Sequence, residues 1–423
     1  MDTRWREIAM SRQGLLGRAW SGRPPCEADD MNSFSPKAVM AGAAAVVALT
    51  ATVTVGYAAA EPPASNLVDS TQVAHLTSDQ LKPVLAGVPF DTASVRYGVT
   101  GYRLRYHTTG PDGQPTIASG LVMIPDGGPR KLPVVMWEHG TRAARNGVAS
   151  MRDDQGDREA TELFASAGYL TVAPDYLGLG AGEGHHPYLD TATAVSASAD
   201  MLRATTAFTD RSNGTVRISG FSQGGAVTMA MSHAVPGVTA LAPISGPYDL
   251  IGTEFPALVD HLGDGPGQVD PKDATFYIAY WTVAKNRLHH LYSSPAEVFQ
   301  APYDKTVEGL FDGSHDDDAI ATALPGSPTQ LLTPQYLTRL RKPTDALRAA
   351  IDAGDGSCRQ DPTVPIRLFA ADGDRDVPIA NTQACLSQLS GKATVVNVGD
   401  ANHDGSAIRS APLVLKWFLD QDR

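Results

Sequence analysis

The hexapeptide Gly220-Phe221-Ser222-Gln223-Gly224-Gly225 stands between a β-branched run at residues 215–218 and a stretch with helical spacing at residues 223–234. It contains the pattern G-x-S-x-G, which functions only where a strand turns sharply into a helix. Glycines 220 and 224 let the backbones crowd together there, and the serine is held in a strained, exposed position. The hexapeptide therefore predicts an elbow, built on Gly220 and Gly224, that presents Ser222 as a nucleophile.

Strand-like and helix-like segments alternate on both sides of this elbow. Strands are expected at residues 94–107, 116–125, 132–138, 169–176, 215–221, 241–245, 366–371 and 393–398, and helices at 157–167, 190–209, 223–234 and 411–420. The first two strands can pair as a hairpin. The alternation that follows predicts an α/β fold, with a mostly parallel sheet and helices on both faces.

The alternation breaks between residues 247 and 357. Roughly 110 residues between two strands are too many for a loop, so we expect a largely helical cap inserted there, between a first core part at 61–246 and a second at 358–423. Cap aromatic residues are expected to pack within the cap for the most part, while some line an apolar pocket. These residues are Phe276, Tyr277, Tyr280, Trp281, Tyr292, Phe299 and Tyr303.

Residues 1–60 have the layout of a leader. Lys37 precedes an uncharged stretch at 38–60, which ends in Ala58-Ala59-Ala60. A basic start, an apolar middle and an A-x-A exit predict a signal peptide that is removed near Ala60, with Met31 as the expected start and export as the consequence. The alternative is a transmembrane anchor, since the uncharged stretch is long enough to span a bilayer. The weak hydrophobicity of Ala and Thr favours the signal peptide, and no stable membrane span is expected after processing.

Removing the leader leaves two cysteines, Cys358 and Cys385. In an oxidising compartment two cysteines favour a disulfide, although two unconnected buried thiols remain the alternative. The cysteine spacing fits no tetrahedral zinc site, and the sequence contains no H-E-x-x-H. We therefore expect neither a metal nor a cofactor.

An apolar strand ends in Trp137-Glu138-His139-Gly140-Thr141. Acyl transfer needs N–H donors placed where the tetrahedral oxyanion forms. We expect the N–H of Gln223 to supply one donor and the N–H of Gly140 or Thr141 to supply the other. His139 is interpreted as a residue that shapes this loop rather than as a catalytic base.

Two late segments offer a carboxylate and a histidine. The strand at 366–371 runs into Asp372-Gly373-Asp374-Arg375-Asp376-Val377-Pro378, and the strand at 393–398 runs into a loop that contains His403. The order Ser, Asp, His is the one expected with a G-x-S-x-G elbow. His403 would take the serine proton and return it to the leaving group, and a buried carboxylate would hold its tautomer. The D-x-x-V-P arrangement selects Asp374, ahead of Asp376 and then Asp372.

Composition limits the classes of partner. The 423 residues carry a net charge of −12, which argues against a nucleic-acid partner because phosphates require a basic surface. A hydrophobic content of 42% is too high for a disordered chain. Composition therefore indicates a folded protein without a nucleic-acid partner.

These motifs resemble the α/β-hydrolases of the secretory-lipase type, a group of exported bacterial esterases, over roughly residues 97–418. The resemblance is carried by residues 137–141, by 173–180 with 186–189, by the Ser222 elbow, and by 294–299 and 373–378. It implies Ser222 as nucleophile, Asp374 as acid, His403 as base, and an acyl ester, including a lipid ester, as substrate. A single glycine after His139 departs from the H-G-G-G lipase pattern, so subclass assignments based on that pattern do not transfer.

The sequence therefore predicts a secreted serine ester hydrolase, a carboxylesterase or lipase that works through an acyl-enzyme. An acyltransferase or a serine peptidase would use the same three residues. A member of the fold that binds an apolar ligand without catalysis is the alternative from another class.

Overall fold

The computed structural model describes residues 65–422 except 89, 91, 154, 155, 266, 361, 390 and 392. The predicted leader, with Met31 and the cleavage site near Ala60, lies outside the described residues. Within the part of the chain that is described, no helix is both long and apolar enough to cross a membrane.

The core is one nine-stranded sheet with the strand order β1-β2-β3-β5-β4-β6-β7-β8-β9. The strands are β1 (Leu67–Leu76), β2 (Gly98–Thr109), β3 (Pro115–Asp126), β4 (Leu132–Glu138), β5 (Leu170–Pro174), β6 (Ser212–Phe221), β7 (Val238–Ile244), β8 (Ile366–Ala370) and β9 (Ala393–Asn397). The first three strands pair antiparallel, and β3 is antiparallel to β5. From β5 to β9 every pairing is parallel. The carboxyl ends of these six strands therefore meet at one edge.

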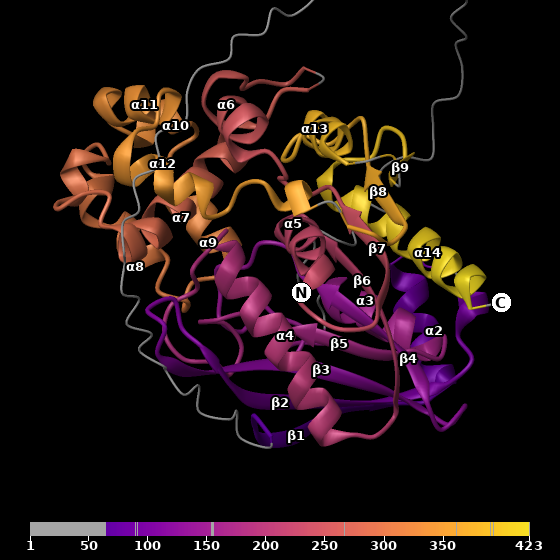
Figure 1. Ribbon diagram of the computed structural model, residues 1–423. Coiled ribbons are helices and arrows are strands. Elements are labelled where there is room, and N and C mark those ends of the chain that lie inside the picture. Colours follow the sequence, from indigo (N-terminus) through magenta and orange to yellow (C-terminus); the bar gives the residue numbers. More distant parts are fainter. Residues whose placement is uncertain are drawn as a thin grey trace, which may run out of the picture. The chain divides into compact units, whose positions relative to one another are not determined.

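Helices cover both faces of the sheet, as the sequence predicts. One face packs on α2 (Ser78–Gly87), α3 (Gly156–Ser166) and α14 (His403–Gln421), and the other on α4 (Thr191–Phe208), α5 (Gln223–Ala230) and α13 (Ala380–Gln388). Figure 1 shows α4 running across the near face of β2, β3 and β5. Asp190 is the N-cap of α4, because its side chain accepts a hydrogen bond from the Thr193 N–H. The predicted α/β architecture is confirmed.

The chain between β7 and β8 forms a helical region with a hydrophobic cluster of its own. After a π-helical turn at Leu250–Glu254 come α6 (Phe255–Asp260), α7 (Pro271–His289), α8 (Val307–Leu310), α9 (Asp317–Ala323), α10 (Pro328–Leu331), α11 (Pro334–Arg341) and α12 (Asp345–Asp352). Figure 1 shows α7 to α12 gathered in orange tones at one side of the sheet. We call residues 247–357 the cap. Buried Lys285 of α7 forms an ion pair with Asp190 at 3.3 Å, so the cap is tied to the start of α4.

A disulfide joins Cys358 to Cys385, 27 residues further on, and confirms the predicted pairing. Cys358 lies in a 3₁₀ turn (Ser357–Gln360) and Cys385 in α13. Both are fully buried against the face that packs on α4 and α5. The bond therefore fixes the end of the cap to the helix that follows the segment containing Asp374.

The sequence pattern misses some elements. It does not predict β1, α2 or α13, and it starts the last helix at residue 411, whereas α14 begins at His403. Asn402 caps α14 by accepting a hydrogen bond from the Gly405 N–H at 3.0 Å. The small residues of this first turn are weak helix formers, and a cap outside the periodic stretch extends the helix over them. The placement of His403 on a loop is therefore wrong.

Candidate active site

Ser222 lies between β6 and α5 with φ 56°, in the left-handed region that a serine rarely adopts. The chain holds this conformation by close backbone packing. A Cβ on Gly224 would lie 2.0 Å from the Glu138 carbonyl oxygen, and one on Gly220 would lie 2.5 Å from the Gly224 carbonyl oxygen. Only glycine fits at these two positions, so β4 and α5 approach closely enough to raise Ser222 above the sheet edge.

The loop after β4 passes beside the elbow. The backbone N–H groups of Gly140 and Thr141 donate no hydrogen bond within the described residues, and the N–H of Gln223 opens α5 without an acceptor in its own helix. His139 faces away from the serine chemistry, because its ring nitrogens lie 2.6 and 3.1 Å from the carbonyl oxygens of Gly140 and Asp175. The loop therefore offers free N–H donors but no base.

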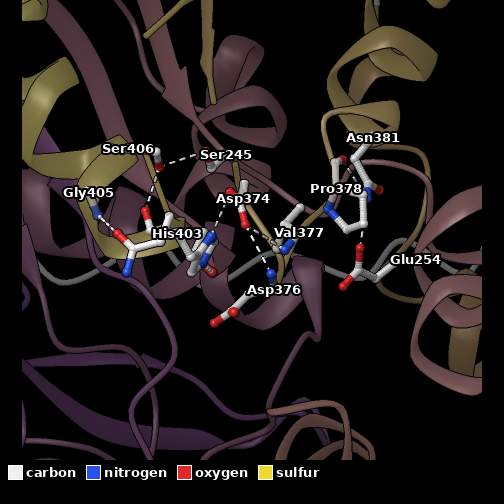
Figure 2. Close-up of polar contacts among 12 residues, drawn as sticks. Ser245, Glu254, Asp374, Asp376, Val377, Pro378, Asn381, His403, Gly405 and Ser406 are labelled. Atoms are coloured by element: carbon white, nitrogen blue, oxygen red, sulfur yellow. Dashed lines mark hydrogen bonds and ion pairs between the residues drawn. The ribbon is translucent and has the colours of Figure 1, made fainter. Parts of the chain in front are cut away.

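Asp374 lies in the turn that follows β8. Its Oδ1 accepts hydrogen bonds from the N–H groups of Asp376 and Val377, both at 3.0 Å. Its Oδ2 lies 2.8 Å from Nδ1 of His403. Figure 2 shows His403 on one side of this carboxylate and the backbone of Asp376 and Val377 on the other. The D-x-x-V-P turn thus fixes the carboxylate while leaving one oxygen for the imidazole.

His403 connects this carboxylate to the serine, since its Nε2 lies 2.9 Å from Oγ of Ser222. Its position is braced through Ser406, whose hydroxyl donates to the His403 carbonyl oxygen at 2.6 Å and contacts the Ser245 hydroxyl at 2.8 Å. Ser222, Asp374 and His403, 181 residues apart at the extremes, are each at most 5% exposed. The structure therefore brings the three sequence-selected side chains into one hydrogen-bonded chain.

The pKa values at this edge are shifted by burial and by neighbouring carboxylates. Burial alone would lower the pKa of His403, but the charge and hydrogen bond of Asp374 outweigh it and raise that pKa above its ordinary value. Burial raises the pKa of Asp376 to about 7, although the nearby His403 opposes the shift. Asp376 accepts a hydrogen bond from the Tyr277 hydroxyl at 2.8 Å, and Asp372 is exposed. Neither takes the place of Asp374 beside the imidazole.

Two cavities meet at Ser222. The first is narrow and mostly apolar and lies between the elbow and the cap, with Leu250, Phe255, Leu258, Ile278 and Trp281 among its lining residues. The second is more polar, and its lining residues include Arg142, His403, Asp273, Asp317, Asp376 and Asp404. The two groups that flank a carbonyl carbon attacked by Ser222 therefore have separate cavities.

The predicted cap aromatics divide between these cavities and the cap interior. Trp281 and Tyr277 line the apolar cavity, and Tyr277 and Phe276 line the polar one. The others, Tyr280, Tyr292, Phe299 and Tyr303, belong to the cap cluster or pack against it.

Sequence reasoning gave no role to Glu254, which is buried and lines the apolar cavity. Its Oε2 accepts a hydrogen bond from Nδ2 of Asn381 at 2.7 Å, as Figure 2 shows. Glu254 is the last residue of the π-helical turn at Leu250–Glu254, and this geometry has no sequence signature. A lone glutamate in a cap segment looks like surface charge, so no pattern could have identified it.

Comparisons with known proteins agree with this architecture. Residues 119–256 match the family model of the X-Pro dipeptidyl-peptidases (S15 family). No curated protein matches the chain.

Two solved structures from bacteria are similar over most of the chain. The rice cell wall degrading esterase LipA from Xanthomonas oryzae is 29% identical, with a TM-score of 0.75 over 86% of this chain and 100% of that one. A Legionella pneumophila protein described as a hydrolase is 29% identical, with a TM-score of 0.73 over 84% and 96% of the two chains. Candida antarctica lipase A in its closed state shares the fold at 15% identity, with a TM-score of 0.62 over 84% of this chain and 81% of that one.

The sheet order, the strand–elbow–helix unit and these likenesses agree with one another. The chain belongs to the α/β-hydrolase superfamily and is a hydrolase similar to its esterases and lipases.

Proposed function

We propose that the protein is a secreted serine hydrolase of carboxylic esters. The observation that supports this most is the position of His403, within hydrogen-bonding distance of Ser222 at 2.9 Å and of Asp374 at 2.8 Å. In the reaction, His403 Nε2 takes the proton of Ser222 Oγ as the oxygen attacks the ester carbonyl. The same nitrogen then gives that proton to the departing alcohol.

The tetrahedral oxyanion is stabilised by backbone N–H groups. The N–H of Gln223 supplies one donor, and the N–H of Gly140 or Thr141 supplies the other, since these amides have no internal acceptor among the described residues. Water activated by His403 then attacks the acyl-enzyme, and the acid is released as Ser222 recovers its proton. Asp374 holds the imidazole tautomer throughout.

Ser222→Ala tests the assignment. The variant should lose at least about 10³-fold in kcat/KM for p-nitrophenyl esters, because no other group supplies the nucleophile. Its thermal unfolding should stay close to that of the wild type, since only one oxygen is removed. Activity within about tenfold of the wild type would refute the proposal, and failure of the wild type to react with a fluorophosphonate probe would favour a non-catalytic ligand-binding protein.

A serine peptidase is the second candidate, and the match to the X-Pro dipeptidyl-peptidase family over residues 119–256 favours it over an acyltransferase. Esters and amides with the same acyl group separate the two hydrolytic activities. An esterase should turn over the Ala-Pro p-nitrophenyl ester far faster than the Ala-Pro p-nitroanilide, whereas a dipeptidyl-peptidase should cleave the anilide efficiently. Added alcohol that diverts the acyl group to a new ester would instead indicate an acyltransferase.

Export is part of the same proposal. Residues 1–60 have the leader layout, the disulfide suits an oxidising compartment, and the core and cap divide as 61–246, 247–357 and 358–423. N-terminal sequencing of the exported protein should therefore give a first residue near Glu61.

A further inference from the structure

The position of His403 decides which part of an ester enters which of the two cavities at Ser222. In the proposed reaction His403 gives its proton to the departing alcohol, so the alcohol must lie on the imidazole side of the carbonyl carbon. Ser222 lines both cavities, whereas His403 lines the polar cavity and not the apolar one, as far as the described residues show. The alcohol part therefore extends into the polar cavity, and the acyl chain is directed into the apolar cavity.

The two cavities differ in size. The apolar cavity has room for little more than about one water molecule, which is also the space that a methyl group needs. The polar cavity is wider, and Asp273, Asp376 and Asp404 in its lining are partly exposed to solvent. The acyl side of the site is therefore the side that limits the size of the substrate.

The wall of the apolar cavity is closely packed. Its apolar side chains from the cap are each at most 5% exposed and belong to the cap cluster; they include Leu250, Phe255, Leu258, Ile278 and Trp281. The rings of Phe255 and Trp281 meet edge to face, with their centroids 4.8 Å apart. Because close-packed side chains yield little, a chain longer than the cavity must displace groups that are already in contact.

Two hydrogen bonds tie this wall to the core. The Tyr277 hydroxyl donates to Oδ2 of Asp376 at 2.8 Å, and Nδ2 of Asn381 donates to Oε2 of Glu254 at 2.7 Å. Tyr277 and Glu254 both line the apolar cavity, and Figure 2 shows Glu254 facing Asn381 across the second of these bonds. Widening the cavity by moving the cap wall outward would therefore break polar contacts as well as apolar ones.

Building on the proposed esterase function, we infer that the protein is selective for acetyl esters. The methyl group of an acetyl ester fills the apolar cavity, whereas a propionyl or longer chain exceeds it. A single methylene in an apolar pocket changes kcat/KM by roughly 10–200-fold, so the rate should fall steeply with acyl length. The alcohol part, which lies in the wider cavity, is restricted much less.

A series of p-nitrophenyl esters with one alcohol and different acyl chains tests this inference. The wild type would be assayed with the acetate, butyrate, hexanoate and octanoate, and each kcat/KM would be divided by the rate of alkaline hydrolysis of the same ester, which removes intrinsic reactivity. The acetate should exceed the butyrate by about tenfold or more, and the longer esters should be slower still. A butyrate or hexanoate that equals the acetate, in solution or as an emulsion, would overturn the inference while leaving ester hydrolysis intact. Failure to hydrolyse any of the four esters would instead count against the proposed function itself.

Two leucines of the cap provide a matched pair of variants. Leu258 and Leu291 are each 5% exposed and belong to the cap cluster, but only Leu258 lines the apolar cavity. Leu258→Ala should raise the ratio of butyrate to acetate kcat/KM by about tenfold, whereas Leu291→Ala should leave this ratio unchanged. Leu258→Val, which removes less volume, should shift the ratio in the same direction if the alanine variant does not fold. An unchanged ratio in a folded Leu258 variant, or an equal shift in Leu291→Ala, would show that this cavity does not hold the acyl group.

Discussion

The elbow and the cap meet at Ser222, but they are held in place by different forces. At the elbow, backbone atoms touch across a distance that only Gly220 and Gly224 permit. In the cap, side chains from many separate helices pack into one cluster around α7. The proposed nucleophile is therefore positioned by short-range steric rules, whereas the apolar cavity beside it is positioned by long-range packing.

Asp374→Asn should cause the largest loss of activity, because it replaces the carboxylate that holds His403 beside the elbow. An amide at this position cannot stabilise the imidazolium and favours the wrong tautomer, so kcat should fall by about 10⁴-fold. Asp376→Asn is the matched control, because Asp376 hydrogen-bonds Tyr277 rather than His403 and should retain activity within about tenfold. Steady-state kinetics of both variants decide between the two carboxylates, and a larger loss in the Asp376 variant would reverse the assignment.

The pH dependence of wild-type kcat/KM also tests the role of Asp374. Catalysis requires neutral His403, and Asp374 raises the pKa of that imidazole. The acidic limb of kcat/KM should therefore lie above pH 6.5, the ordinary value for histidine, and residual activity of Asp374→Asn should rise at lower pH than the wild type. A limb at or below the ordinary histidine value in the wild type would contradict the electrostatic role given to Asp374.

Alanine at two glycines compares the two regions directly. Gly224→Ala would place a methyl group 2.0 Å from the Glu138 carbonyl oxygen, so the elbow must open, at a cost of about 3 kcal/mol or more and most of the activity. Gly309→Ala in α8 of the cap has nothing within 4 Å of the new methyl group, and it should change stability by less than about 1 kcal/mol in the favourable direction. Chemical denaturation of the two variants measures the difference, and similar values would show that the elbow is not sterically tight.

The sequence carries most of the information about the core because that information is local. The elbow motif, the D-x-x-V-P turn and the strand runs each depend on residues adjacent in the chain. The wrong prediction of a loop at His403 shows the limit of this local information. The first turn of α14 is fixed by a cap at Asn402 and by the contact of Ser406 with Ser245, and neither is visible in hydrophobic periodicity.

The cap was predictable as a helical insertion but not in detail. Of seven aromatic residues in similar contexts, Trp281 and Tyr277 line the apolar cavity and Phe299 lies in the cap interior. Their sorting depends on which helices pack together, and Glu254 enters the site through a π-helical turn. Contacts between residues far apart in the chain decide both features, so a single sequence leaves them open.

Glu254 links the two regions, because it belongs to the cap and its hydrogen-bond partner Asn381 belongs to the core. Glu254→Gln tests this link. The carboxyl has a pKa of about 8 when folded, raised by burial, against 4.5 as its ordinary value. Its unfolded form ionises freely, so the contribution to stability is complete below pH 4.5 and is lost as the pH rises toward about 8. Glutamine keeps the acceptor for Asn381 and does not titrate. Between pH 5 and pH 8.5 the free energy of unfolding of the wild type should therefore fall relative to the variant by about 1–3 kcal/mol. Denaturation curves at several pH values measure this difference, and parallel pH dependence of the two proteins would mean that Glu254 ionises in the folded state as readily as in water.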